Sequence, residues 1–352
     1  MQKKKLALCV ELTEENIEEL LEYCEVVPAG YYKRKKKNIT ENELLDDCLS
    51  SELVIVGYEN VSGKCIDVLV ESGMKIIGCT RSTPVNIDWK AVHYHNIPLI
   101  YTPGRNAVSV AEFTIGLMIA LSRHIARAYS DLKLGRHLAP PVDDIFIVPQ
   151  KEDVVWRPNG QRVLDSYGFG IELMGSVIGI VGYGAIGTKL GQIAKAIGME
   201  VIAHDPYVLP ETMEKDGVKA ASLEYLVKNS DFVSIHLPVT PETVGIIDES
   251  LFLLMKPKAY FVNTSRASVV DQRAFIETMK NKRIAGAAID VSWQEPMPSN
   301  HPVLEMDNVI ITPHIGGLTV EVNKKWTSQL ITQEILRYCR NEPVRNLWTR
   351  VE

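Results

Sequence analysis

Short apolar runs rich in β-branched residues alternate with amphipathic stretches along most of the chain. In the first hundred residues the runs predict strands at 6–10, 53–56, 75–78 and 97–101. Helical spacing of apolar positions predicts helices at 13–23 and 65–71. Parallel strands need crossover helices between them, so this alternation predicts a parallel α/β sheet.

The same alternation resumes at residue 177 and continues to 312. Strands are expected at 177–181, 201–204, 232–236, 260–263, 284–289 and 309–312. A helix is expected at 185–197, where Ile186, Leu190 and Ile193 share one face. A second parallel α/β sheet follows from this pattern.

Three segments interrupt the alternation. Thr102-Pro103-Gly104 reads as a hinge between domains. Residues 109–125 form a helical candidate that is apolar nearly all round, which requires burial in a core or against a second subunit. Residues 134–174 are irregular and rich in proline, which is typical of a functional arm or a mobile loop.

Composition narrows the class of protein. The 352 residues are 46% apolar and 23% charged with a formal net charge of −6, as in a globular protein without a nucleic-acid partner. Two basic clusters, 3–5 and 33–37, are expected to be solvated surface loops. The six cysteines are scattered and form no C-x-x-C pair, which argues against a disulfide framework and a structural metal. No secretory signal or membrane span is recognised, so a cytoplasmic location is expected.

The chemistry begins with the glycine pattern Gly182-x-Gly184-x-x-Gly187, which follows the strand at 177–181 and opens the helix at 185–197. In a dinucleotide site the first glycine makes the turn, the second admits the pyrophosphate and the third lets helix and strand pack closely. The helix N-terminus at Ala185 and Ile186 then offers N–H donors to phosphate oxygens. A glycine-rich turn without a ligand is the structural alternative.

The next strand ends in Asp205, 18 residues beyond Gly187, near the spacing of the acid that binds an adenosine ribose. A carboxylate there accepts from the ribose hydroxyls and repels a 2′-phosphate, and Pro206 supplies no positive charge. The sequence therefore favours NAD over NADP as cofactor.

Four downstream segments, "SIHLPVTPET" at 234–243, "FVNTSRASVVD" at 261–271, "AAIDVSWQEP" at 287–296 and "ITPHIGG" at 311–317, carry further chemistry. Together with the glycine loop they resemble the D-isomer-specific 2-hydroxyacid dehydrogenases, which include glycerate, phosphoglycerate and D-lactate dehydrogenases. The resemblance runs from about residue 75 to the C-terminus. It implies an NAD-dependent oxidoreductase that interconverts a D-2-hydroxy acid and its 2-oxo acid.

The resemblance implies three catalytic residues. Arg266 matches the arginine that binds the substrate, His314 the acid–base, and Glu295 the carboxylate that partners the histidine. A planar guanidinium suits a carboxylate, and histidine is a proton donor near neutral pH, which a neighbouring carboxylate helps to keep protonated. Taken singly, each has a structural alternative: a surface ion pair for Arg266, a loop charge for Glu295 and a backbone-bonded strand end for His314.

The resemblance also implies contacts with the cofactor. Asp290 matches the residue that contacts the nicotinamide carboxamide, and the motif segments place His236, Pro238, Thr264, Ser265 and Gly316 at the same site. A structural role is favoured for His236, because it need not titrate during turnover.

The loop at 78–88 occupies the place of the family's substrate-carboxylate loop, and it carries Thr80, Arg81, Ser82 and Thr83. It is more polar and cationic than selection of a small alkyl group requires. We expect Arg81 to meet a second anionic or hydroxyl-rich part of the substrate, as in a phosphorylated or sugar-derived acid, unless a local acid pairs with it. Asn106, before the long helix, is a further substrate-site candidate, and Glu112 is a charge favoured near a helix start.

The fold expected is two doubly wound α/β domains, with a Rossmann domain at 104–315 inserted into a flavodoxin-like substrate domain built from 1–103 and 316–352. A helix at 328–338 is expected to pack back on the first domain. The domains should close around the substrate, and the helix at 109–125 suggests a homodimer. Two rival functions stay open: a formate dehydrogenase, whose motif carries glutamine in place of Glu295, and an NAD-sensing protein resembling corepressors of this fold.

Overall fold

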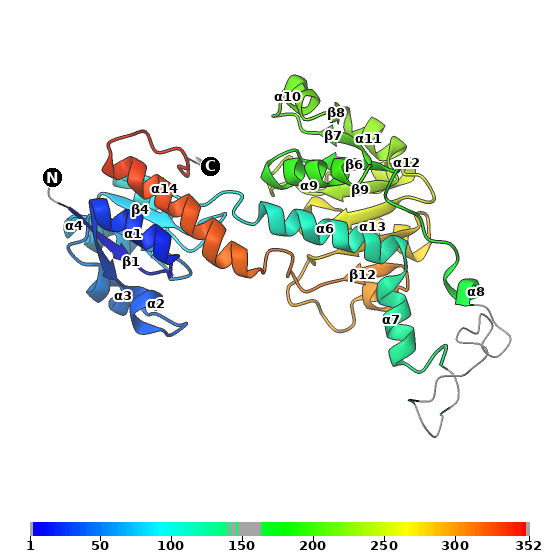
Figure 1. Ribbon diagram of the computed structural model, residues 1–352, viewed down its shortest axis with the longest axis horizontal. Coiled ribbons are helices and arrows are strands. Elements are labelled where there is room, and N and C mark those ends of the chain that lie inside the picture. The colour runs from blue at the N-terminus through cyan, green and yellow to red at the C-terminus, as the bar shows by residue number, and fades with distance from the viewer. Residues whose placement is uncertain (1–2, 139–140, 142–145, 147–162, 350–352) are drawn as a thin grey trace. The chain divides into compact units, whose positions relative to one another are not determined.

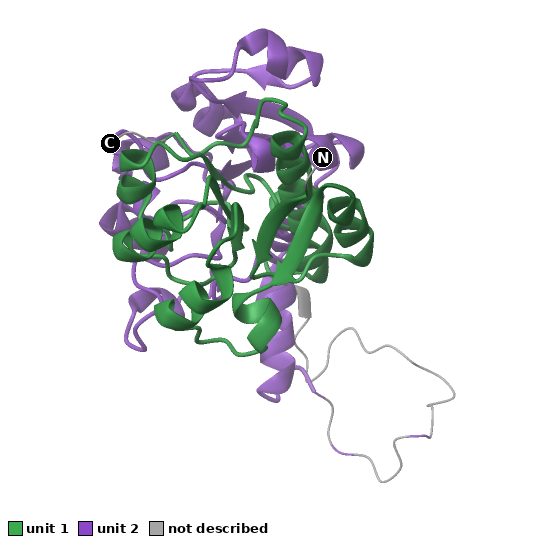
Figure 2. Ribbon diagram, turned by 90° about the vertical axis from the view of Figure 1, so that its left-hand side faces the viewer, with its two compact units in different colours: residues 1–109, 317–352 green, residues 110–316 purple. Residues whose placement is uncertain are grey.

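The computed structural model describes residues 3–138, 141, 146 and 163–349. The chain forms two compact units, one of residues 1–109 and 317–352 and one of residues 110–316 (Figure 2). The sequence pattern predicts these divisions at 103/104 and 315/316. The difference arises because the turn after Thr102 and the first residues of the long helix stay with the first unit.

Unit 1 contains a five-stranded parallel sheet. Its strands are β1 (Lys4–Leu8), β2 (Cys24–Pro28), β3 (Leu53–Val56), β4 (Ile76–Cys79) and β5 (Leu99–Ile100). The order β2-β1-β3-β4-β5 is that of flavodoxin-like folds, which bind ligands where the order reverses. Strand β2 was not predicted, because it follows the preceding helix at Tyr23 without a turn residue between them.

Helices cover both faces of this sheet (Figure 1). On one face pack α3 (Glu41–Cys48), α4 (Gly63–Glu71) and α5 (Trp89–Tyr94). On the other pack α1 (Glu14–Tyr23) and the C-terminal helix α14 (Thr327–Cys339), whose Ile331 and Ile335 contact the buried leucines of β1 and β3. The last helix therefore completes the core that the first hundred residues begin.

Unit 2 contains a seven-stranded parallel sheet in the order β12-β11-β10-β9-β6-β7-β8. Its strands are β6 (Val177–Val181), β7 (Glu200–His204), β8 (Lys219–Ala220), β9 (Phe232–Ile235), β10 (Tyr260–Asn263), β11 (Gly286–Ile289) and β12 (Val309–Ile311). The order reverses between β6 and β9, as in a Rossmann sheet, so the carboxyl ends of these strands form the expected ligand edge. The prediction of two doubly wound parallel sheets is confirmed.

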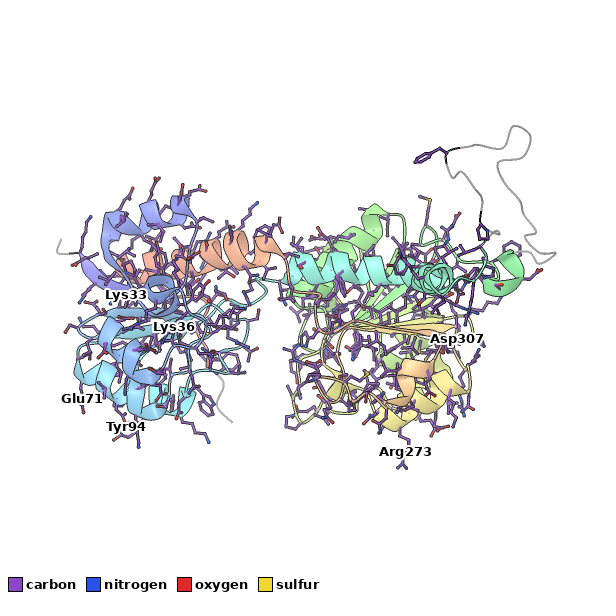
Figure 3. All side chains as sticks on the ribbon, turned by 90° about the horizontal axis from the view of Figure 1, so that it is seen from below. Lys33, Lys36, Glu71, Tyr94, Arg273 and Asp307 are labelled. Carbon is purple, nitrogen blue, oxygen red and sulfur yellow. The ribbon has the colours of Figure 1, made fainter. Side chains whose placement is uncertain are left out.

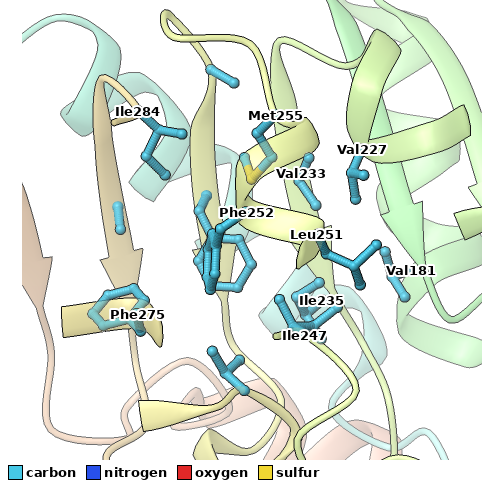
Figure 4. Close-up of a cluster of buried hydrophobic side chains, with 14 of the residues drawn as sticks. Val181, Val227, Val233, Ile235, Ile247, Leu251, Phe252, Met255, Phe275 and Ile284 are labelled. Carbon is cyan, nitrogen blue, oxygen red and sulfur yellow. The ribbon is translucent and has the colours of Figure 1, made fainter. Parts of the chain in front are cut away.

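Strand side chains of unit 2 alternate between two cores. One core lies under α6 (Ala107–Ser122), α9 (Ala185–Ala196) and α10 (Pro210–Lys215). The other lies under α11 (Leu223–Asn229), α12 (Glu249–Leu254) and α13 (Gln272–Lys280), where Phe252, Phe261 and Phe275 meet (Figure 4).

The long apolar helix differs from its prediction. It ends at Ser122 rather than at 125, since His124 adopts a left-handed conformation (φ 56°), and α7 (Ile125–Lys133) starts a new direction bent by 64°. Most of α6 is buried, but Glu112, Gly116 and Ile119 are exposed along one stripe. No single helix in the described ranges is long and apolar enough to cross a membrane; α6 and α7 pass that test only when counted together.

The basic cluster at 33–37 is not the plain solvated loop that was expected. Its start lies in the short helix α2 (Gly30–Arg34), and both Lys33 (labelled in Figure 3) and Arg34 bind the buried carboxylate of Asp47. Burial raises the pKa of Asp47, but the hydrogen bonds from Arg34 and Lys33 outweigh it and hold that pKa below its ordinary value.

Most of the predicted arm at 134–174 lies outside the described residues. Its end is described: α8 (Val163–Tyr167) is followed by Ile171 and Leu173, which pack against the core under α6 and α9.

The six cysteines are all free and buried. The sulfur atoms of Cys9 and Cys48 are 3.9 Å apart, and those of Cys24 and Cys339 are 3.4 Å apart. The other two are Cys65 and Cys79.

Candidate active site

The glycine loop between β6 and α9 has the shape that a dinucleotide requires. Gly182 has φ 94°, and a Cβ there would lie 2.5 Å from the carbonyl oxygen of His236. A Cβ on Gly187 would lie 2.1 Å from the carbonyl oxygen of Gly182. At Gly184, in contrast, a Cβ would meet no atom of the described residues within 4 Å. Two glycines thus close the turn, and the third leaves its outer side open to a phosphate.

The first turn of α9 offers donors at this open side. Gly184 is the N-cap residue and no side chain caps the helix. The N–H groups of Ala185, Ile186 and Gly187 have no acceptor among the described residues, whereas that of Thr188 donates to the carbonyl of Gly184 (2.9 Å). Free N–H groups and the positive helix end suit an anion such as a pyrophosphate.

Asp205 follows β7, next to the glycine loop. Its carboxylate accepts from the N–H of Tyr183 (2.9 Å) and from the N–H of Tyr207 (2.9 Å), one bond to each oxygen. Each oxygen therefore keeps a free lone pair for a hydroxyl donor. The arrangement fits a ribose contact and also fixes the loop that would hold the phosphates.

His236, after β9, is neutral. Its Nε2 bonds to Ser234 Oγ (2.8 Å), and its Nδ1 is buried without a partner among the described residues. Burial lowers the pKa of His236 to about 3, so it does not exchange protons near neutral pH. Pro238, two residues on, is exposed.

The turn after β10 carries Arg266. Its exposed guanidinium donates from Nη1 to the carbonyl of Ser265 (2.7 Å) and has no carboxylate within ion-pair distance among the described residues. Thr264 and Ser265 before it are buried, and Thr264 Oγ1 lies 3.1 Å from Thr114 Oγ1 of α6. A free guanidinium on a fixed turn can bind an external carboxylate with two hydrogen bonds.

His314 and Glu295 are in contact. Nδ1 of His314 lies 2.8 Å from Oε2 of Glu295, and its Nε2 has no partner among the described residues. Partial burial raises the pKa of Glu295, but the hydrogen bond from His314, the N–H of Ser292 and the charge of Arg266 outweigh it. The pKa of Glu295 is therefore below its ordinary value, and it is a carboxylate at neutral pH. The pair leaves Nε2 free to give or take a proton.

Asp290, after β11, is buried behind this histidine. Its carboxylate accepts from Thr312 Oγ1 (2.6 Å), the N–H of Ile315 (2.9 Å) and the N–H of Gly316 (2.8 Å). A Cβ on Gly316 would lie 2.9 Å from Asp290 Oδ2, so glycine is required there. The sequence analysis gave Asp290 a cofactor contact and did not foresee these bonds to its own chain.

The predicted substrate loop lies in unit 1, after β4. Arg81 forms no ion pair with any described residue, and its guanidinium lies 5.1 Å from the centre of the Tyr58 ring. The N–H groups of Ser82 and Thr83 have no acceptor among the described residues, while Thr80 is buried with its hydroxyl 3.5 Å from the carbonyl of Val56. Asn106 lies against Gly317, whose Cβ would be 3.3 Å from its Nδ2.

Two residues near these sites were missed from the sequence. Asn263, the last residue of β10, is 1% exposed and bonds to the turn of Arg266; its place at a strand end was the available signal. Arg105, after β5, donates to Thr327 Oγ1 (3.1 Å), and no motif marked it. In the described part of the chain, no three His, Cys, Asp or Glu side chains gather in a way that could hold a metal ion.

The site can now be compared with known proteins. Residues 115–316 match the family model described as D-isomer specific 2-hydroxyacid dehydrogenase, NAD binding domain. D-3-phosphoglycerate dehydrogenase of Methanocaldococcus jannaschii is 33% identical over 310 residues, which are 88% of this chain and 54% of that protein. This chain therefore spans about half the length of that relative. Glyoxylate reductase of Thermococcus litoralis is 34% identical over 74% of this chain and 73% of its own length.

Solved structures agree at the level of the fold. D-mandelate dehydrogenase of Rhodotorula graminis superposes with a TM-score of 0.78 at 21% identity, covering 99% of both chains. A D-isomer specific 2-hydroxyacid dehydrogenase from Lactobacillus delbrueckii in its NAD complexed form gives 0.76 at 21% identity, covering 98% of this chain and all of that one.

Proposed function

The chain belongs to the D-isomer specific 2-hydroxyacid dehydrogenases, with its NAD binding domain at 115–316, and from this premise we propose that it interconverts a D-2-hydroxy acid and its 2-oxo acid with NAD. The observation that carries the proposal is the contact between His314 Nδ1 and Glu295 Oε2, which are 2.8 Å apart. The positive charge of Arg266 helps to lower the pKa of this glutamate. These are the three residue types that the reaction needs, on loops after the neighbouring strands β10, β11 and β12, at the same carboxyl edge of the sheet as the glycine loop.

Each residue has a chemical task in the proposal. Arg266 binds the substrate carboxylate and orients the adjacent carbonyl. His314 donates the proton from Nε2 to the carbonyl oxygen in reduction and removes it from the hydroxyl in oxidation, while Glu295 holds Nδ1 and stabilises the imidazolium. The glycine loop and the first turn of α9 would hold NADH, which would supply the hydride, so that one hydride and one proton would convert the oxo acid to the hydroxy acid.

A panel of 2-oxo acids with NADH tests the proposal, followed by the loss of nicotinamide absorbance. Turnover of at least one 2-oxo acid, and a D-configured product, are expected. NADH binding without turnover of any acid would instead favour the NAD-sensing alternative. Reduction of NAD⁺ by formate would favour formate dehydrogenase, although Glu295 stands where that enzyme has glutamine.

For the substrate we propose an acid with a second anionic or hydroxyl-rich group, such as a phosphorylated or sugar-derived acid. Support comes from Arg81, whose guanidinium has no carboxylate partner among the described residues and is held near the Tyr58 ring. The free N–H groups of Ser82 and Thr83 suit the first carboxylate, which leaves Arg81 for the second group. The family relatives act on differing acids by name, including phosphoglycerate, glyoxylate and hydroxypyruvate.

We further propose a homodimer formed through α6 and α7. Ile119 of α6 is 39% exposed, and Ile125, Tyr129 and Leu132 of α7 are 50–65% exposed. Apolar side chains repeated along exposed helix faces are typical of an interface.

The six free cysteines support a reducing compartment such as the cytoplasm.

A further inference from the structure

Two buried polar side chains stand at the ends of neighbouring strands and are hydrogen-bonded to the turns that carry Arg266 and His314. Asn263 closes β10 and is 1% exposed, and Asp290 follows β11 and is 2% exposed. The N–H of Asp290 donates to the carbonyl of Asn263 (3.0 Å), so the ladder joins the two positions. A buried amide and a buried carboxylate are costly unless their polar atoms are hydrogen-bonded.

Asn263 uses its amide on the turn of Arg266. Its Nδ2 donates to the carbonyl of Arg266 (2.9 Å), and its Oδ1 accepts from the N–H (3.0 Å) and the hydroxyl (2.9 Å) of Ser265. The side chain thus holds the peptide group that precedes Ser265 and the peptide group that follows Arg266. The guanidinium itself is exposed, and among the described residues its hydrogen bond is to the carbonyl of Ser265.

Asp290 does the same for the turn of His314. Its three hydrogen bonds hold the hydroxyl of Thr312 and the N–H groups of Ile315 and Gly316, on both sides of the histidine. His314 itself has φ 57°, in the left-handed region that costs a non-glycine residue about 1 kcal/mol. A conformation of that kind persists only where its surroundings fix it, and here the buried carboxylate does so.

We propose that Asn263 and Asp290 are positioning residues that set the directions of Arg266 and His314 through the backbone of their turns. The inference rests on the proposed function, because it gives these turns their importance. Asn263 acts on substrate binding through Arg266. Asp290 acts on proton transfer through His314, which adds to or replaces the nicotinamide contact expected for it from family resemblance. Neither residue touches the reacting atoms in this role.

The substitutions Asn263→Asp and Asp290→Asn keep the size of each side chain and break its bonds. Asn263→Asp loses the amide group that donates to the carbonyl of Arg266. Asp290→Asn places an NH₂ group opposite one of the two backbone N–H groups that donate to the carboxylate in the wild type, so that two donors face each other. With the 2-oxo acid that the wild type reduces best, Asn263→Asp should raise KM about tenfold or more, with NADH affinity by fluorescence within about twofold. Asp290→Asn should lower kcat about tenfold or more with KM nearly unchanged.

Matched controls separate positioning from general stability. Asn308→Asp removes a similar bond, from Asn308 Nδ2 to the carbonyl of Met279 (3.1 Å). Asp231→Asn weakens a similar carboxylate that accepts from the N–H of Val177 (2.9 Å) at the opposite end of the strands. Both controls should leave KM and kcat within about twofold, whatever they do to the melting temperature.

Double variants complete the test. If Asn263 acts through Arg266, adding Asn263→Asp to Arg266→Ala should change kcat/KM by less than twofold, and Asp290→Asn should likewise add little to His314→Gln. Full additivity would overturn the proposal. So would a rise of NADH Kd as the main effect of Asp290→Asn, since that marks a cofactor contact.

Milder variants serve if a substitution unfolds the chain. Asn263→Ser gives a shorter side chain that weakens the contact with the carbonyl of Arg266. Thr312→Val removes only the hydrogen bond from Thr312 to Asp290. Thr312→Val should lower kcat several-fold with NADH affinity unchanged, and Asn263→Ser should raise KM several-fold. An unchanged kcat in Thr312→Val together with an unchanged KM in Asn263→Ser would contradict the inference. An inactive wild type with every 2-oxo acid would sink the proposed function instead, a result visible before any variant is made.

Discussion

At the scale of single residues, the contact between His314 and Glu295 makes the strongest claim. Replacing Glu295 by Gln leaves the shape but removes the charge that stabilises an imidazolium. We expect kcat for 2-oxo acid reduction to fall by about 10²–10⁴, as for loss of a positioned proton transfer. Steady-state kinetics on purified Glu295→Gln would measure it, with the exposed Glu305→Gln as a control. Activity of Glu295→Gln within threefold of wild type would contradict the role.

Arg81 makes a separate prediction about the substrate. Arg81→Ala should raise KM for an acid with a second anionic group, such as 3-phosphohydroxypyruvate, about tenfold more than KM for glyoxylate, because only the former can use the guanidinium. The comparison needs KM for both acids in each variant. Arg340→Ala is the matched control, since that arginine also lies over a tyrosine ring, 4.8 Å from the centre of Tyr23. Equal changes for the two acids would remove Arg81 from specificity.

At the scale of elements, two glycines of one loop should behave differently. A Cβ on Gly184 would meet no atom within 4 Å in the part of the chain that the structure describes, and the φ of −79° at this position suits alanine. Gly184→Ala should therefore fold normally and bind NADH about tenfold or more weakly, because the methyl group fills the phosphate side of the loop. Gly187→Ala should lower the melting temperature, since its Cβ would lie 2.1 Å from the carbonyl of Gly182. Thermal melts measure the stability of both variants, and NADH fluorescence measures their affinity for the cofactor. Unimpaired NADH binding by Gly184→Ala would contradict the assignment of this loop as the phosphate site.

The ion pairs of Lys33 and Arg34 in α2 with Asp47 in α3 predict that the stability of the fold depends on pH in the acidic range. The pKa of Asp47 is lowered in the fold, so its stabilisation is present above the ordinary carboxyl value of about 3.9 and is lost as pH falls through the folded value. Asp47→Asn should melt several degrees lower at pH 7, as about 1 kcal/mol shifts a domain of this size by about 2–4 °C. Below pH 4 its melting temperature should fall less than that of wild type. The exposed neighbour Asp46→Asn is the control, and parallel pH curves for Asp47→Asn and wild type would refute the assignment.

At the scale of the whole molecule, the proposed dimer is open to a direct test. The exposed side chains of Tyr129 and Leu132 lie on α7, and placing lysines there should break an apolar interface by adding like charges to both copies. Wild type should sediment at twice the chain mass, and the variant Tyr129→Lys/Leu132→Lys at the single mass. Tyr207→Lys/Leu209→Lys, at more exposed positions elsewhere, should leave the dimer intact. A monomeric wild type would exclude the interface.

The hydrophobic pattern was enough to predict both sheets and most of their strands, because buried parallel strands are continuous apolar runs that few other elements imitate. It missed β2 and β8, which are short or begin without a turn signal. It also ran the long helix through His124, since periodicity does not reveal a residue that turns left-handed. The motif residues stood out because glycines, an arginine and a histidine at strand ends have specific spacings.

By itself the sequence determined the family, the cofactor fingerprint and the residue types of the proposed site, since these depend on local patterns and fixed spacing. Only the tertiary structure decided which groups are bonded to which. Glu295 contacts His314, and Asp290 and Asn263 form hydrogen bonds with the turns of His314 and Arg266. Arg81 has no carboxylate partner among the described residues. Such contacts join segments that are far apart in the chain. Their geometry follows from the way these distant segments come together at one edge of the sheet, which local patterns and spacings along the chain do not specify.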